Sequence, residues 1–334
     1  MPGVTVGHFT LAQGARQTGV TVVRPHEGDP FRNKVPAAAT VLNGFGKSCG
    51  LIQVEELGVL ETPIALTNTF AVGAVANAQI RQAIAANPEI GRAWPTVNPL
   101  VFECNDGYLN DIQAQAVAEA HYEQAWRGAA SVFEQGSVGA GRGMSSFGFK
   151  GGIGSASRLA EAYPGQRYTV GALVLSNFGQ RSSMTIAGRP FGRRLAAAAR
   201  DGEPAGQPEK GSIILLLATD APLDSRQLRR LSLRAGAGLA RTGSVFGHGS
   251  GDIALAFSTA YTIPHLAERG MPVQVMLHET RIDALFEAAA EAVEQAIVAA
   301  LWRAETVAGR DGHVRRAIRE AAPQWRQWLA ETAF

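Results

Sequence analysis

The chain has 334 residues, of which 46% are hydrophobic and 18% are charged. This balance is typical of a globular protein with a sizeable core, and it excludes wholesale disorder. Because 31 Lys and Arg stand against 29 Asp and Glu, the net charge is only +2, which argues against a nucleic-acid partner with its need for a concentrated basic face.

Cysteine usage and hydropathy give further limits. Cys49 and Cys104 are the only two cysteines and stand in no metal-ligand spacing. The N-terminal residues lack the charged and apolar regions of a signal peptide, and no stretch approaches 18 consecutive apolar residues. We therefore expect a soluble, cytoplasmic protein without a membrane partner.

Apolar runs separated by turn residues predict the elements of the first half of the chain. We expect strands at residues 4–6, 20–23, 37–42, 61–69 and 100–102, and helices at 72–86 and 112–127. Residues 43–48 look like a phosphate-binding loop, but Val41 stands where that pattern needs glycine, so no nucleotide site is expected. The glycine-dense residues 136–158 indicate backbone packed closely against another backbone or a ligand.

The second half continues the alternation of strands and helices. Strands are expected at residues 168–175, 213–217, 253–257 and 273–277, and a helix at 284–307. Asp224 is predicted to cap a second helix with an apolar stripe of Leu228, Leu231, Ala235 and Leu239. Residues 201–210, rich in Pro, Gly and charge, are predicted to be a mobile excursion. We expect one α/β domain, with helices covering stacked sheets.

Ser250 lies between two glycines directly before the apolar residues 253–257. Gly249 and Gly251 leave the backbone free to adopt conformations that a side chain would block. A nucleophile elbow is excluded, since it needs glycines two residues either side of the serine, where His248 and Asp252 stand. Two interpretations remain: an ordinary loop entering a strand, or a Gly-Ser bond that undergoes an N→O acyl shift and frees Ser250 as an N-terminal nucleophile.

Two further strand ends carry polar side chains. Glu103, Asn105, Asp106 and Tyr108 follow the strand at 100–102, where they either form a surface Asx turn or converge on a small-molecule site. Asn177 follows the strand at 168–175, where it is either a turn residue or a donor that stabilises an oxyanion.

Several short motifs in order along nearly the whole chain resemble one family. It is the L-aminopeptidase/D-esterase and β-peptidyl aminopeptidase family of self-processing hydrolases with an N-terminal serine nucleophile. The motifs are Pro2-Gly-Val-Thr-Val-Gly-His8, Thr18-Gly-Val-Thr-Val22, Asn43-Gly-Phe-Gly-Lys47, Glu61-Thr-Pro-Ile-Ala-Leu-Thr-Asn-Thr69, Asn105-Asp-Gly-Tyr-Leu-Asn-Asp111, Phe149-Lys-Gly-Gly-Ile-Gly154, Val170-Gly-Ala-Leu-Val174 with Asn177, Ala218-Thr-Asp-Ala-Pro222, Arg241-Thr-Gly243 and Gly249-Ser-Gly-Asp252.

The resemblance implies an αββα fold related to ornithine acetyltransferase, over one domain of residues 1–334. It implies cleavage between Gly249 and Ser250 into chains 1–249 and 250–334, which stay associated and assemble as tetramers. The implied activity removes N-terminal residues from small peptides, amides or esters, without a metal or cofactor.

The resemblance also implies roles for individual residues. Ser250 is the processing residue and nucleophile, and Asn177 is an oxyanion donor. Glu103 holds the substrate's amino group, which suits a carboxylate because an ammonium needs a charge-assisted acceptor. Asn105, Asp106 and Tyr108 line the same pocket, and Lys150 has a supporting role.

One stretch departs from the family pattern. Where the family has a polar residue and an acidic partner, the chain reads His278-Glu279-Thr280, and an ungapped alignment puts Thr280 at the acidic position. Either the strand end shifts so that Glu279 serves, or the site works without that acid, or processing is impaired. A Ser250 and His278 pair is a further alternative.

The preferred hypothesis is an autoprocessing aminopeptidase that acts through an acyl-enzyme on Ser250. Two rivals remain at this point. One is a related self-processing acyltransferase that passes the acyl group to an amine, and the other is a non-catalytic member that has lost its acid partner.

Overall fold

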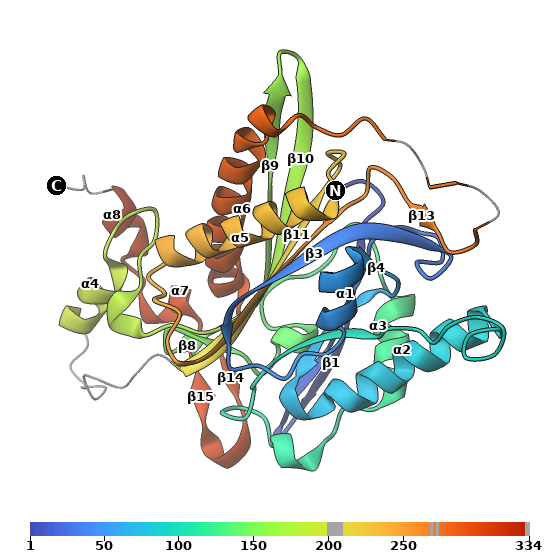
Figure 1. The fold of residues 1–334 in the computed structure, drawn as a ribbon. Helices are drawn as coiled ribbons and strands as arrows, with labels where there is room; N and C mark the ends of the chain where they lie inside the picture. The colour runs from blue at the N-terminus through green and yellow to red at the C-terminus, as the bar shows by residue number, and fades with distance from the viewer. Residues whose placement is uncertain (199–209, 268–269, 272–273, 331–334) are drawn as a thin grey trace.

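The computed structural model describes residues 1–198, 210–267, 270–271 and 274–330, and these form a mixed α/β structure with two main sheets (Figure 1). The smaller sheet has the strand order β1-β2-β5-β6. Its strands are β1 (Thr5–Gln13), β2 (Arg16–Arg24), β5 (Ile64–Asn68) and β6 (Leu100–Cys104). β5 and β6 are parallel, so Asn68 and Cys104 end side by side at one edge.

The larger sheet holds the Ser250 strand near its centre. Its order is β13-β3-β12-β11-β10-β9, with β4 paired to β3. The strands are β3 (Asn33–Gly44), β4 (Val59–Leu60), β9 (Gly152–Tyr163), β10 (Gln166–Asn177), β11 (Lys210–Thr219), β12 (Gly249–Ser258) and β13 (Ile263–Pro264). β12 runs parallel to β11 and antiparallel to β3. Hydrogen bonds on both sides therefore fix the backbone at Ser250.

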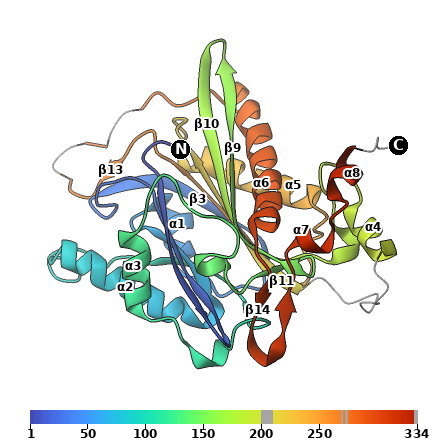
Figure 2. The same cartoon turned by 180° about the vertical axis from the view of Figure 1, so that it is seen from behind.

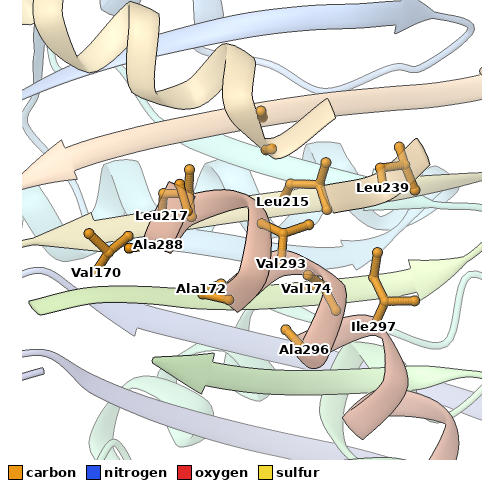
Figure 3. Packing of buried hydrophobic residues seen from close by; sticks show 14 of the residues in the cluster. Val170, Ala172, Val174, Leu215, Leu217, Leu239, Ala288, Val293, Ala296 and Ile297 are labelled. Atoms are coloured by element: carbon orange, nitrogen blue, oxygen red, sulfur yellow. The ribbon is translucent and has the colours of Figure 1, made fainter. Parts of the chain in front are cut away.

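Two long helices cover the larger sheet. These are α5 (Ser225–Arg241) and α6 (Asp283–Arg303), and α6 lies along β9 and β10 (Figure 2). Their apolar side chains share one buried cluster with β10, β11 and β12, and Figure 3 shows Val293 and Ile297 of α6 in this cluster with Leu215 of β11. The predicted cap of α5 is confirmed, because Asp224 Oδ1 accepts a hydrogen bond from Gln227 N at 2.7 Å.

Two further helices, α2 (Val72–Ala86) and α3 (Glu119–Arg127), contribute to a buried cluster with β2, β5 and β6. A separate cluster contains apolar side chains of both sheets, such as Leu66 and Phe102 from the smaller and Leu216 and Leu255 from the larger. The inner side of each sheet is therefore buried against the other.

Close backbone packing joins α6 to β9, as the glycine-dense residues predicted. A Cβ on Gly154 would lie 1.9 Å from the carbonyl oxygen of Ala296, so only glycine lets the helix approach this strand. The strand itself was not predicted, because its glycines and serines gave no apolar run.

Short elements complete the described structure. The α-helices are α1 (Leu51–Leu57), α4 (Phe191–Ala198), α7 (Ile318–Ala321) and α8 (Trp325–Ala330). The 3-10 helices are η1 (Thr69–Ala71), η2 (Ile112–Ala114), η3 (Gly139–Gly141), η4 (Arg181–Ser183), η5 (Glu279–Arg281) and η6 (Arg310–Gly312). Two small hairpins pair β7 (Ser145–Ser146) with β8 (Phe149–Lys150) and β14 (Val307–Ala308) with β15 (Val314–Arg315).

Three predicted elements need correction. The helix expected at 112–127 is helical at η2 and α3 only, because Gln115 has φ 44° and Ala118 is extended. The helix expected at 284–307 ends at Arg303, since Ala304 is extended. Residues 274–277 are not a strand, and Val273 lies outside the described residues. Residues 201–209 of the predicted excursion also lie outside them, and Lys210 begins β11.

Hydropathy of the helices is modest. Among the described residues, no helix is long and apolar enough to cross a membrane.

Candidate active site

A tight turn leads into Ser250 at the start of β12. The Ser250 amide donates to the carbonyl oxygen of Gly247 at 2.9 Å. Asn43 Nδ2 donates to the carbonyl oxygens of both Gly247 and Ser250, at 2.7 and 2.6 Å. One amide group from β3 therefore holds the backbone on both sides of the Gly249-Ser250 bond, a role that the sequence reasoning did not assign to Asn43.

The Ser250 hydroxyl lies against Asp252. Residues two apart in a strand point to the same face, so the two side chains are neighbours. Ser250 Oγ donates to Asp252 Oδ1 at 2.5 Å, and both residues are fully buried. The sequence reasoning assigned Asp252 no role, because it used this residue to reject the nucleophile elbow and otherwise only quoted it within a family motif, although the two-residue spacing was visible.

Gly251 connects Ser250 to the segment after β3. A Cβ on Gly251 would lie 2.7 Å from the carbonyl oxygen of Phe45, so this close approach requires glycine. On the other side, the Gly251 amide donates to Ser212 Oγ of β11 at 3.2 Å. The glycine beside Ser250 therefore allows the start of β12 to pack closely against the segment that follows β3.

Glu103, at the end of β6, is buried beside the same segment. Its Oε1 accepts from the Lys47 amide at 2.8 Å, and its Oε2 accepts from the Thr69 hydroxyl. A Cβ on Gly46 would lie 3.6 Å from Glu103 Oε1 and 3.8 Å from Gly251 Cα. Glu103 and the residue after Ser250 therefore flank one glycine, although they belong to different sheets.

Asn177 ends β10, two strands away from Ser250. It pairs with Ser212 of β11, which in turn pairs with Gly251 of β12. Its Oδ1 accepts from the Ser145 amide at 2.8 Å, and its Nδ2 donates to the Asn105 carbonyl oxygen at 3.0 Å. The side chain therefore joins the end of β10 to the turn after β6.

That turn has the Asx geometry that was one of the two predicted alternatives. Asn105 Oδ1 accepts from the Gly107 amide at 2.8 Å. Asp106 is fully buried, with Oδ1 accepting from Asn110 Nδ2 at 3.0 Å and Oδ2 lacking a hydrogen-bond partner. Burial raises the pKa of Asp106 to about 7. Asp106 therefore stands beneath the turn as a protonatable acid.

Tyr108 is exposed, with 38% of its surface accessible. Its ring stacks on His313 at a centroid distance of 4.5 Å, and the Arg315 guanidinium lies 3.6 Å from the ring centroid. Both partners belong to the β14–β15 segment, so the C-terminal hairpin packs against the predicted substrate-binding turn.

Lys150 is fully buried and holds the loop beside Asn177. Its ammonium donates to the carbonyl oxygens of Gly141, Met144 and Gly151 at 2.8, 2.9 and 2.9 Å. Burial lowers the pKa of Lys150 well below its ordinary value, with a smaller contribution from Arg142. Three carbonyl acceptors match the three N–H groups of an ammonium, so Lys150 holds this loop together.

Three carboxylates meet around Cys104. Its pKa is raised well above the ordinary value, first by burial and then by the negative charges of Glu103, Asp252 and Asp106. The structure therefore brings the Ser250 strand, the end of β6 and the turn after it into one buried region.

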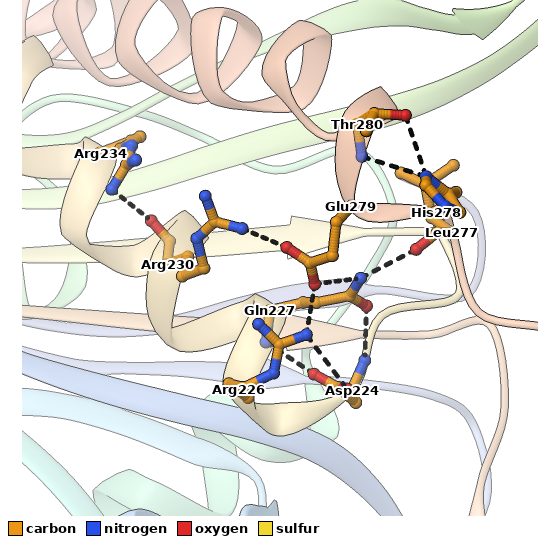
Figure 4. A network of polar contacts seen from close by, with 9 residues as sticks. All are labelled: Asp224, Arg226, Gln227, Arg230, Arg234, Leu277, His278, Glu279 and Thr280. Carbon is orange, nitrogen blue, oxygen red and sulfur yellow. Dashed lines mark hydrogen bonds and ion pairs between the residues drawn. The ribbon is translucent and has the colours of Figure 1, made fainter.

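The structure does not bring Glu279 to Ser250. Glu279 accepts hydrogen bonds from Arg226 and Arg230, and from Gln227 Nε2 at 3.0 Å, all at the start of α5 (Figure 4). These ion pairs lower the pKa of Glu279, chiefly through Arg226. The expectation that a shifted strand end delivers Glu279 to the nucleophile is wrong, because residues 279–281 form η5 instead.

The same segment lies at the opposite end of the larger sheet. The Leu277 amide donates to the Pro222 carbonyl oxygen at 2.9 Å, just beyond β11, whereas Ser250 stands at the other end of β12. The eight residue steps from Ser250 to Ser258 span about 26 Å in a strand. His278 Nδ1 contacts the Thr280 hydroxyl at 2.9 Å, so neither residue reaches the nucleophile and a Ser-His pair is not formed.

Comparison with known proteins identifies the family of this chain. Residues 1–315 match the model of Peptidase family S58. The chain belongs to this family.

The chain is also similar to a curated protein and to solved structures over most of its length. The chain is 40% identical to the beta-peptidyl aminopeptidase BapA of Sphingosinicella microcystinivorans, with 93% of this chain and 82% of that protein covered. Among solved structures, the PH0078 protein of Pyrococcus horikoshii OT3 is 48% identical, with a TM-score of 0.90 over 98% of this chain and 91% of that one.

A second solved structure describes the fold. The L-aminopeptidase D-Ala-esterase/amidase of Ochrobactrum anthropi is 35% identical, with a TM-score of 0.88 over 98% of this chain and 93% of that one. It is described as a prototype for the serine aminopeptidases and a new variant of the Ntn hydrolase fold. This S58 family chain has a similar mixed α/β fold.

Proposed function

We propose that this S58 family chain is an autoprocessing aminopeptidase with an N-terminal serine nucleophile. The observation that carries the proposal is the position of Ser250 at the start of a central strand, after a turn fixed by Asn43. The names of its relatives, beta-peptidyl aminopeptidase and L-aminopeptidase, support removal of N-terminal residues as the reaction.

Processing begins with an N→O acyl shift. Ser250 Oγ attacks the Gly249 carbonyl carbon, the carbon to nitrogen bond breaks, and water hydrolyses the resulting ester. The products are chains 1–249 and 250–334. The freed α-amine of Ser250, with an ordinary pKa of about 7.7 to 8.0, then serves as general base for its own hydroxyl.

In the mature enzyme, Ser250 attacks the first acyl bond of a small peptide, amide or ester, and water hydrolyses the acyl-enzyme. Glu103 binds the substrate ammonium by exchanging its present donors, and Asn105 and Tyr108 line the pocket. Asn177 Nδ2 turns from the Asn105 carbonyl oxygen to the oxyanion, a donor worth about 3 kcal/mol. No metal takes part in these steps.

The architecture that we propose is one αββα domain of four layers. It is supported by three apolar clusters, one between the larger sheet and α5 and α6, one between the two sheets, and one between the smaller sheet and α2 and α3. We further propose that the cleaved pairs assemble as homotetramers.

Intact-mass measurement tests the proposal. Purified protein should change from one species of full length to two that correspond to residues 1–249 and 250–334, and it should then release the first residue from a panel of α- and β-amino-acid amides. Ser250→Ala should remain uncut and inactive. A wild-type chain that stays uncut through long incubation would refute the processing step.

A further inference from the structure

Processing requires a group that removes the proton from Ser250 Oγ. The free α-amine does not exist before cleavage, because the Ser250 nitrogen is still part of the peptide bond. A hydroxyl is a weak nucleophile unless a neighbouring base accepts its proton. The uncut chain must therefore supply a base that the mature enzyme does not need.

From the contacts of Ser250, we infer that Asp252 is this base. Its Oδ1 accepts the hydroxyl hydrogen bond at 2.5 Å, the length of a charge-assisted O–H···O⁻ bond and close enough for direct proton transfer. In the parts of the chain that the structure describes, no other side chain hydrogen-bonds the Ser250 hydroxyl. The inference rests on the proposed function, which leaves the processing base unassigned.

Four other ionisable groups are engaged elsewhere, among them Asp106, which accepts from Asn110 Nδ2. Glu103 accepts from the Lys47 amide and the Thr69 hydroxyl. The Lys150 ammonium donates to three carbonyl oxygens, and Glu279 lies at the far end of the larger sheet. Asp252 is therefore the ionisable group that is placed to accept the proton of the Ser250 hydroxyl.

The backbone around Ser250 also suits this role. Asn43 holds the carbonyl oxygens of Gly247 and Ser250, and the Gly251 amide is held by Ser212. Because these bonds hold the surrounding backbone, the attack requires only that the Ser250 side chain turn from Asp252 toward the Gly249 carbonyl carbon.

The step balances without a further reactant. Asp252 Oδ1 takes the hydroxyl proton as Ser250 Oγ bonds to the Gly249 carbonyl carbon, whose π electrons move to oxygen. Collapse of this intermediate breaks the bond to the Ser250 nitrogen, and Asp252 returns the proton to that nitrogen. Water then hydrolyses the ester, as in the proposed function.

The test is the rate of chain cleavage in Asp252→Asn, measured by intact mass from freshly refolded protein. Asparagine keeps an oxygen acceptor of the same size but cannot take the proton. Cleavage should slow by roughly 10²- to 10⁴-fold, the usual effect of losing a general base. The matched control is Asp220→Asn, which changes a carboxylate beyond the far end of β11 that accepts from the Thr169 amide. Its cleavage rate should equal that of the wild type.

Hydroxylamine separates the chemical step from later ones, because it cleaves an ester but not an amide. Asp252→Asn should stay uncut in hydroxylamine, since its ester does not form, while Asp252→Glu should recover part of the rate. Circular dichroism and thermal melting of the uncut variants establish that they are folded. If Asp252→Asn does not fold, the Asp252→Glu rate alone decides, and the inference fails if that variant folds without measurable cleavage.

The outcomes distinguish this inference from the proposed function. A wild-type chain that never cleaves refutes the proposed function. A wild-type chain that cleaves, together with a folded Asp252→Asn chain that cleaves at the same rate, overturns only the inference. Rapid hydroxylamine cleavage of Asp252→Asn also overturns it, because the ester would then form without this carboxylate.

Discussion

Replacing Lys150 by methionine should destabilise the chain by up to about 3 kcal/mol. The change keeps the length of the side chain but removes three hydrogen bonds to the carbonyl oxygens of Gly141, Met144 and Gly151. The Gly141 and Met144 carbonyls keep a backbone donor each, so about 1 kcal/mol for each lost bond is the appropriate scale. Removing the buried ammonium also removes its desolvation cost, which offsets part of the stability lost with the hydrogen bonds.

Urea unfolding measures this effect best in a Ser250→Ala background, where the chain should remain one species. The matched control is Lys47→Met, which removes an exposed ammonium 4.2 Å from the Phe45 ring centroid and should cost less than about 1 kcal/mol. In the processing-competent chain, Lys150→Met should also slow cleavage, because the same loop carries the Ser145 amide bonded to Asn177. Equal stability changes for the two lysine variants would refute the reasoning.

Three other measurements test separate parts of the structure. Burial raises the pKa of Asp106 from 3.8 to about 7, so stability should fall by about 4 kcal/mol as pH rises across that window, and Asp106→Asn should flatten this slope in urea unfolding. Burial lowers the pKa of His8 from 6.5 to about 4. The stability that neutral His8 contributes is therefore complete above pH 6.5 and should be lost as pH falls through 4. Thermal melts of wild type and His8→Gln should converge at that pH. Glu279→Gln should leave the cleavage rate unchanged and have little effect on stability, because its ion pairs are solvent-exposed; slower cleavage by intact mass would contradict the position of Glu279 at the far end of the sheet.

Much of the fold follows from local sequence patterns. The apolar run at 253–257 lies within β12, and the helix expected at 72–86 has the bounds of α2. β9 was missed because Gly152 and Gly154 interrupt its apolar pattern, although Gly154 is what admits α6. Residues 274–277 were assigned to a strand because an isolated apolar run does not reveal whether a partner strand is available.

The site was harder to predict because its contacts join residues far apart in the chain. Glu103 and Asn177 stood out as polar residues at strand ends, but nothing local indicated that Asn177 would bond to the Ser145 amide and the Asn105 carbonyl oxygen. The importance of Asn43 depends on the register between β3 and β12, which the sequence does not specify. Glu279 was assigned by alignment alone, and the ion pairs to α5 that decide its position lie about fifty residues earlier.

The arrangement also explains why cleavage at Gly249-Ser250 need not separate the two proposed chains. β12 lies between β3 and β11, both of which belong to residues 1–249, and it pairs with them along most of its length. α6 adds a second attachment, because it packs against β9, β10 and α5. A new N-terminus at Ser250 is therefore anchored within a residue or two of the cut by strands on both sides. Among the described residues, contacts of the preceding segment 247–249 are the hydrogen bonds of the Gly247 carbonyl, the ring contact of His248 with Phe45 and the first pairing of Gly249 with Lys210. Because Ser250 is fully buried in the uncut chain, movement of this short segment is the most economical way to expose the proposed nucleophile, and the proposed cleavage would release the segment.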